Sequence, residues 1–167
     1  KMFSDTNSFD EVALESYDHV LVQLGNNIFK KRKAFVAEFL PVFRRFYNFI
    51  VDDEVADIHY NTELAQIGFQ EGLNKNRKRD LLLQRTSFGI HRDDYHFTLG
   101  AGDLKRLGSQ GQQKSFVIAL KLAQFEVIHQ KKKFKPILLL DDIFDKLDDN
   151  RISRLLDLIR KDELGQL

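Results

Sequence analysis

The chain has 167 residues, 43% of them hydrophobic, and its 26 basic and 25 acidic side chains leave a formal net charge of +1. This composition is typical of a globular protein with one domain or two small ones, and the balanced charge points to no class of partner. The absence of cysteine excludes disulfides and thiolate chemistry, and no apolar run approaches the ~20 residues of a membrane span. We therefore expect a cytoplasmic protein without membrane contact.

A helical apolar pattern occupies the first third of the chain. Apolar residues recur three or four positions apart over residues 8–24 and again over residues 28–50. The run Gly25-Asn26-Asn27 separates the two stretches, and Pro41 lies inside the second. The pattern predicts either two helices or one long, interrupted helix with a bend near Pro41.

Shorter elements follow between residues 55 and 107. Residues 55–60 alternate loosely and predict a strand, whereas the polar stretch 70–85, with its leucines, predicts a helix. Residues 87–99 are extended in pattern, and the turn at Gly100–Asp103 predicts a hairpin with a short strand before Leu107.

A well-marked helix begins after Ser109. Ser109 and Gln112 have the S-x-x-Q spacing of a capping box, and Lys131–Lys133 closes the helix where positive charge suits the C-terminal dipole. A last helix is predicted over residues 149–160. The expected buried positions of the two helices are Phe116, Ala119, Leu120, Ala123, Val127, Ile152, Leu155, Leu156 and Ile159.

Between these two helices, four aliphatic residues, Ile137–Leu140, run directly into Asp141 and Asp142. A short uninterrupted aliphatic run favours a strand that is buried on both faces, as in the parallel sheet of an α/β domain. Carboxylates at the end of such a strand suit a cation or a proton transfer. This is a Walker B pattern, in which Asp141 would hold Mg²⁺ and Asp142 would orient or deprotonate the attacking water. The alternative is a strand followed by an acidic turn that caps the next helix.

Two further segments allow both a structural and a ligand-binding interpretation. The residues Ser109–Gln112, a serine and a glycine at a helix start, form either an anion site or a capping box without a ligand. The residues Asp145–Asp148 form a turn in which Asp148 is expected to be the N-cap of the last helix.

The order of these segments resembles that of the ABC-type ATPases, and the residues resemble the RecF branch of the SMC/Rad50/RecF group. Ser109-Gln110-Gly111-Gln112 resembles the signature, Ile137–Asp142 the Walker B strand and Asp145–Asp148 the D-loop. Gly89-Ile90-His91-Arg92-Asp93-Asp94 resembles the Gly-Pro-His-Arg-Asp-Asp run of RecF. We call Ser109–Gln112 the signature-like segment and Asp145–Asp148 the D-loop-like turn.

The sequence also departs from the family pattern. Ile90 stands in place of the usual proline, and Asp142 stands where most ABC ATPases have glutamate, which suggests slow turnover. No G-x-x-x-x-G-K-[ST] Walker A motif occurs in the 167 residues, and the switch histidine of the group is missing. We therefore expect these residues alone to be inactive. For His91 and Arg92 we favour a structural role where the two predicted domains meet.

The resemblance implies an α/β fold: an incomplete ABC-ATPase head, with signature helix and Walker B strand, joined to a long helical arm. The implied domains are residues 1–88, an arm similar to domain II of RecF, and residues 89–167, the C-terminal part of the head. The implied site residues are Asp142 for catalysis, Asp141 for the metal, and Ser109, Gly111, Gln112, Asp145 and Asp148 for the nucleotide.

The function that the resemblance implies is that of a RecF-like DNA repair ATPase, of which this chain is a C-terminal fragment. In such proteins two heads enclose two ATP molecules with Mg²⁺, so that ATP binding closes a homodimer on DNA. RecF proteins bind gapped or single-strand-junction DNA and, with RecO and RecR, promote the loading of RecA.

Two other classes remain open on the residues alone. One is a carboxylate-metal nuclease that uses Asp141, Asp142 and Asp145 as a two-metal cluster. The other is a non-enzymatic helical arm that binds DNA or a protein through the basic run Lys75–Arg79 and the Phe-rich helix.

Overall fold

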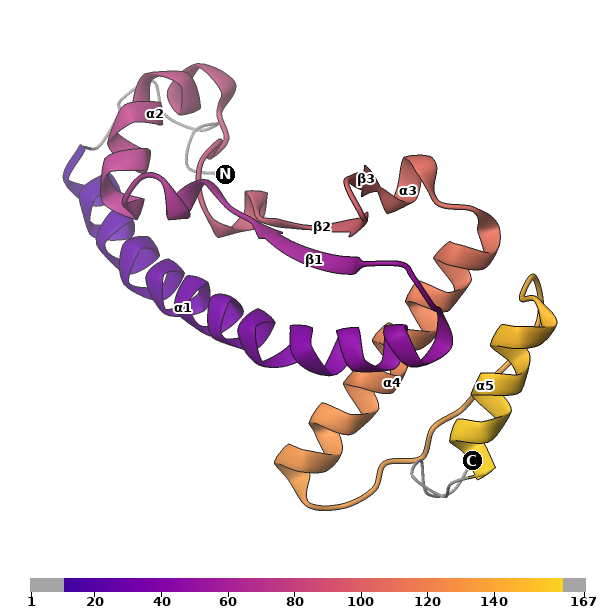
Figure 1. Ribbon diagram of the computed structural model, residues 1–167. Helices are drawn as coiled ribbons and strands as arrows, with labels where there is room; N and C mark the ends of the chain where they lie inside the picture. Colours follow the sequence, from indigo (N-terminus) through magenta and orange to yellow (C-terminus); the bar gives the residue numbers. More distant parts are fainter. Residues whose placement is uncertain (1–10, 161–167) are drawn as a thin grey trace. The chain divides into compact units, whose positions relative to one another are not determined.

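A computed structural model describes residues 11–160 (Figure 1). They pack as two compact units, each built from segments that are distant in sequence. The first unit combines the chain up to Phe35 with Tyr60–Tyr95, and the second combines Val36–His59 with the chain from His96 onward. The division into arm and head at residue 88 remains a prediction. The elements in order are α1 (Glu11–Ile50), β1 (Ala56–Asn61), η1 (Glu63–Ala65), α2 (Phe69–Leu83), η2 (Ile90–Arg92), β2 (Asp94–Leu99), β3 (Gly102–Asp103), α3 (Leu104–Leu107), α4 (Gln110–Lys132) and α5 (Asp149–Arg160).

The first long element, α1, is one continuous helix of 40 residues with Pro41 inside it. The alternative of two helices is therefore wrong, and Gly25 does not end the helix. A Cβ atom on Gly25 would lie 2.2 Å from the ring of Phe69, the first residue of α2. The glycine is thus explained by the close approach of an aromatic ring, which offsets its low helix propensity.

The first unit has a small aromatic core where α2 packs beside the N-terminal part of α1 (Figure 1). The rings of Phe69 and Phe88 meet edge to face, with their centroids 5.9 Å apart. A Cβ atom on Gly72 would lie 2.1 Å from the Phe88 ring, so glycine makes room for it. The buried members of this core are Leu64, Phe69, Leu73 and Phe88.

The second unit has a larger core that is organised around α4. Figure 1 shows α4 crossing the C-terminal part of α1, with α5 beside it. The ring of Phe116 lies 4.6 Å from that of Phe43 and 5.9 Å from that of Tyr47. The predicted core positions Phe116, Ala119, Ala123, Val127 and Leu155 are buried, and Leu120, Ile152 and Leu156 are half-buried. The side chain of Ile159 lies outside the described residues.

The sheet has three strands in the order β1-β2-β3. The predicted strand near residues 55–60 and the predicted hairpin are confirmed, because β2 pairs with β3 in antiparallel register, with Thr98 opposite Asp103. Across the described part of the chain, no helix has both the length and the apolar character needed to cross a membrane.

Residues 135–140 do not form the strand that the aliphatic run predicts, and they take no regular secondary structure. Only Leu138 is buried, whereas Ile137 and Leu139 are 69% and 86% exposed. The run therefore alternates between a buried and an exposed face instead of being covered on both. A strand needs a hydrogen-bonded neighbour, and the three-stranded sheet of the described residues does not include this segment.

Candidate functional site

The signature-like segment begins α4 with a complete capping box, as predicted. The Ser109 hydroxyl oxygen accepts from the Gln112 backbone N–H at 3.2 Å, and the Gln112 side-chain oxygen accepts from the Ser109 backbone N–H at 2.8 Å. Because the Ser109 hydroxyl only accepts in this pair, it retains its own O–H for donation to a ligand. Ser109 and Gln110 are exposed at the start of a helix of 23 residues, where the dipole favours negative charge.

The chain between Asp141 and Asp148 forms a tight turn. Asp142 and Lys146 both have left-handed backbone conformations, with φ of 52° and 62°. Asp148 caps α5 as predicted, because its carboxylate accepts from the backbone N–H of Arg151 at 3.0 Å. The turn therefore has a defined backbone conformation, and its carboxylates are exposed.

The fold brings this turn against the start of α4. A Cβ atom on Gly111 would lie 3.1 Å from the carbonyl oxygen of Lys146, so the glycine permits the close approach of the D-loop-like turn. The ammonium of Lys114, one helical turn along α4, donates to the carbonyl oxygen of Asp142 at 2.8 Å. Two of the three predicted segments are therefore neighbours, although about 30 residues separate them in the sequence.

A polar cluster behind this contact was not predicted from the sequence. The carboxylate of Glu54, in the loop after α1, accepts from the Tyr47 hydroxyl at 2.7 Å, from the Gln112 amide at 3.1 Å and from the Arg151 guanidinium at 3.4 Å. We call these four residues the Glu54 cluster. Burial, together with the hydrogen bond to Glu54, raises the pKa of the Tyr47 hydroxyl far above its ordinary value. No motif marks Glu54, because its partners come from three different elements.

The acids of the predicted site are exposed and do not gather into a metal cluster. Within residues 11–160, no group of three or more His, Asp or Glu side chains is placed to hold a metal ion. The carboxylate of Asp145 lies 3.9 Å from the Lys146 ammonium, and the carboxylates of Asp141 and Asp142 have no partner among the described residues. The structure therefore does not form the Asp141–Asp142–Asp145 cluster that a two-metal nuclease requires.

Within the Gly89–Asp94 motif, the side chain of Asp93, and not that of His91, lies in the interior of the first unit. The Asp93 side chain is 2% exposed and accepts from the Arg32 guanidinium at 3.0 Å and from the Tyr60 hydroxyl. Its other oxygen is buried without a partner among the described residues. His91 contacts the carbonyl oxygen of Thr86 at 3.0 Å, and the Arg92 side chain is exposed.

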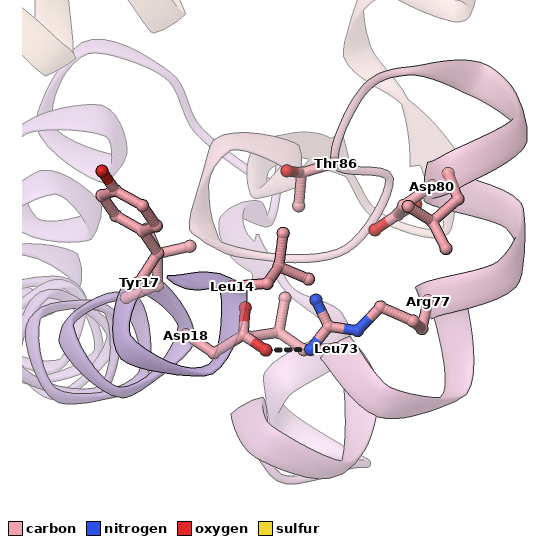
Figure 2. Close-up of a pocket in the computed structure, with 9 residues that line it drawn as sticks. Leu14, Tyr17, Asp18, Leu73, Arg77, Asp80 and Thr86 are labelled. Carbon is pink, nitrogen blue, oxygen red and sulfur yellow. Dashed lines mark hydrogen bonds and ion pairs between the residues drawn. The ribbon is translucent and has the colours of Figure 1, made fainter. Parts of the chain in front are cut away.

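The first unit also holds a cavity of about 270 Å³, between α1 and α2. Figure 2 shows Arg77 of α2 reaching Asp18 of α1, with which it forms an ion pair beside Leu14 and Leu73. One residue of the basic run Lys75–Arg79 is thus engaged within the unit. Lys75, Lys78 and Arg79 remain exposed, as a solvated or DNA-binding face requires.

The geometry defines a class: part of an ABC-type ATPase head with a long helical arm. A solved structure of the recombination mediator protein RecF with ATP, from the RecFOR pathway, superposes with a TM-score of 0.78 at 29% identity, over 91% of this chain and 43% of that one. A second, with an ATP analogue, has the same TM-score at 28% identity and covers 96% of this chain and 45% of that one. No protein-family model matches the sequence.

Curated relatives specify the family. The DNA replication and repair protein RecF of Cytophaga hutchinsonii is 44% identical over all of this chain and 45% of its own length. That of Flavobacterium johnsoniae is 42% identical over all of this chain and 47% of its own length. The chain belongs to the RecF family, and it spans about half the length of the curated relatives it matches.

Proposed function

We propose that this chain supplies the signature and Walker B half of the nucleotide site of a RecF-type DNA repair ATPase. The observation that carries the proposal is the contact between the start of α4 and the turn that begins at Asp142, made through Gly111 and Lys114. In the ATP-bound dimer that the family resemblance implies, the signature of one subunit faces the γ-phosphate bound by the other subunit, so each chain must present both segments. The family membership supports the same conclusion.

The roles follow from the chemistry of each group. Ser109, Gly111 and Gln112 present a hydroxyl, an open backbone and the first N–H groups of α4 to a phosphate. Asp145 and Asp148 lie in the turn beside them and complete the nucleotide contacts. Asp142 orients or deprotonates the water that attacks the γ-phosphate.

Asp141 is the residue proposed to hold Mg²⁺. Mg²⁺ is bound through one or two carboxylates together with phosphates and water, and the exposed Asp141 carboxylate, without a partner among the described residues, fits that need. The ion would neutralise charge that develops on the phosphates. The other phosphate contacts are assigned to a Walker A loop, which these 167 residues do not contain.

Residues 137–140 are proposed to become the Walker B strand in a protein of full RecF length. Ile137 and Leu139 are exposed while Leu138 is buried, which is the pattern of a strand that lacks its neighbour. Pairing with a strand from the rest of such a protein would satisfy the backbone and cover the exposed side chains. Asp141 and Asp142 would then lie at the carboxyl end of a sheet.

At the level of the assembly, we propose ATP-dependent dimerisation, binding to gapped or single-strand-junction DNA, and action with RecO and RecR in loading RecA. Support comes from the relatives, which are named DNA replication and repair proteins, and from the RecFOR pathway to which the solved RecF belongs. The exposed basic residues Lys75, Lys78 and Arg79 offer one surface for phosphates.

The experiment that tests this function is the change Asp142→Asn in a protein of full RecF length that contains these residues. The amide is isosteric but cannot accept a proton, so ATP binding should persist while kcat falls by about 10²-fold or more. Calorimetry measures the binding and phosphate release measures the turnover. Asp149→Asn, which changes an exposed acid at the start of α5, is the matched control and should leave both unchanged. Turnover at the wild-type rate in Asp142→Asn would show that this role is wrong.

A further inference from the structure

The Glu54 cluster links three helices, α1, α4 and α5, whose relative positions matter for the proposed nucleotide site. Tyr47 belongs to the last part of α1, Gln112 to the first turn of α4 and Arg151 to the first turn of α5. Glu54 itself lies in the loop between α1 and β1. Within the described part of the chain, its carboxylate accepts a hydrogen bond from each of these three residues.

Two of the three partners of Glu54, Gln112 and Arg151, are also bonded to residues of the proposed site. The Gln112 side-chain oxygen accepts from the Ser109 backbone N–H at 2.8 Å, while its amide nitrogen donates to Glu54 at 3.1 Å. The Arg151 guanidinium lies 3.1 Å from the Asp148 carboxylate and 3.4 Å from the Ser115 hydroxyl. Glu54 thus contacts the signature-like segment directly, at Gln112, and reaches the D-loop-like turn through one intervening side chain, that of Arg151.

Burial makes this arrangement rigid. Tyr47 and Ser115 are fully buried, and the side chains of Arg151 and Glu54 are only 17% and 24% exposed. A charge-assisted hydrogen bond in such surroundings is stronger than one in water, and a linked network is worth more than its separate pairs. The two ends of the Gln112 amide each have a partner, so its orientation is fixed.

We propose that Glu54 is a positioning residue, which holds the starts of α4 and α5 at a fixed spacing and couples them to the C-terminal end of α1. The inference rests on the proposed function, because the spacing matters only if both segments act on one nucleotide. Glu54 touches no reacting atom in this scheme. Its effect is to keep Ser109 and Asp148 in register, so that a change at the end of α1 alters the site.

Hydrogen exchange in this 167-residue chain tests the positioning directly. Glu54→Ala should raise the exchange rates of the backbone amides of Gln112, Gln113, Arg151 and Ile152 about tenfold, which corresponds to about 1.4 kcal/mol. These amides begin α4 and α5, and their acceptors are Ser109 and Asp148. Amides in the middle of α4, over residues 118–127, should exchange at the wild-type rate.

The matched control is Asp52→Ala. Asp52 lies in the same loop and pairs with Arg154 of the same helix α5, at 2.7 Å, but contacts neither Gln112 nor Arg151. It should leave the four amides unchanged. Glu54→Gln retains one acceptor oxygen, so it serves as the test if Glu54→Ala does not fold. It should give a smaller rise in the exchange rates of the same amides. Unchanged exchange in Glu54→Ala, or a uniform rise through α4 in both Glu54 variants, would overturn the proposal.

A second measurement connects the positioning to turnover. In a protein of full RecF length, Glu54→Ala should lower kcat about tenfold at saturating ATP while KM stays constant, because nucleotide affinity resides mainly in the phosphate loop. A rise in KM with unchanged kcat would contradict the positioning role. A wild-type protein without ATPase activity would instead refute the proposed function, and the exchange rates would still decide the role of Glu54.

Discussion

Tyr47 illustrates what a single residue contributes to this fold. Its ring lies in the core of the second unit against Phe43 and Phe116, and its hydroxyl donates to Glu54 at 2.7 Å. The side chain thus joins the apolar core to the polar cluster behind the site. Tyrosine suits this position because it has an apolar body and one polar tip, which must find a partner when it is buried.

A pH-dependent prediction follows for Tyr47. Burial and Glu54 raise its pKa in the folded state, so the unfolded chain ionises first as the pH rises past ~10, and this contribution to stability is lost above that value. Tyr47→Phe should cost about 1–3 kcal/mol at neutral pH and should then lose less stability between about pH 9 and about pH 11.

Urea unfolding of the wild type and the variant at both pH values measures this effect. Tyr95→Phe, at an exposed tyrosine, is the control and should follow the wild type. An identical loss of stability with pH in wild type and Tyr47→Phe would contradict the pKa shift.

At the start of α4, one structural element combines a helix cap with the proposed anion site. The capping box satisfies two backbone N–H groups that would otherwise lack partners, and it does so independently of any ligand. The cap and the proposed anion site are therefore the same structure. The ligand would meet a helix start that is already formed.

Substitution of Ser109 separates the cap from its ligand-binding role. Ser109→Ala should lower the free energy of unfolding of the 167-residue chain by about 1 kcal/mol, since the Gln112 N–H loses its acceptor. Ser109→Asn restores an acceptor and should recover most of the loss. Thermal or urea denaturation measures both variants, and equal stability of Ser109→Ala and the wild type would show that the cap contributes nothing.

On the proposed function, these 167 residues carry only part of a nucleotide site. The segments assigned to the signature, Walker B and D-loop all lie in the second unit, and the sequence contains no Walker A motif. The backbone N–H groups and lysine of such a loop provide most contacts to the phosphates of ATP in P-loop enzymes. A chain without it has the acids and the helix start but lacks the main phosphate cradle.

We therefore expect these 167 residues, on their own, neither to bind ATP tightly nor to hydrolyse it. Isothermal calorimetry with ATP and Mg²⁺ should show no stoichiometric binding at micromolar concentrations. A protein of full RecF length serves as the positive control. Stoichiometric binding with micromolar affinity by the 167-residue chain would overturn the assignment of the missing contacts.

The sequence alone determined the features that depend on neighbouring residues. The capping box at Ser109, the hairpin after Gly100 and the N-cap at Asp148 are set by local hydrogen bonds and turn geometry, so a short pattern is enough to predict them. The order of the signature-like, Walker B and D-loop-like segments pointed to the family in the same way. The three local predictions agree with the structure, and the family agrees with the RecF relatives.

Tertiary structure decided the rest. From the sequence, a glycine such as Gly25 predicts the end of a helix, and only the structure shows the Phe69 ring packed against it. Likewise, an aliphatic run predicts a strand, and only the structure shows that this run has no paired neighbour in the described sheet. Glu54 carries no local signal, since its importance arises from three partners that are brought to it by α1, α4 and α5. Packing and long-range hydrogen bonds depend on residues far apart in the chain, and no local pattern encodes them.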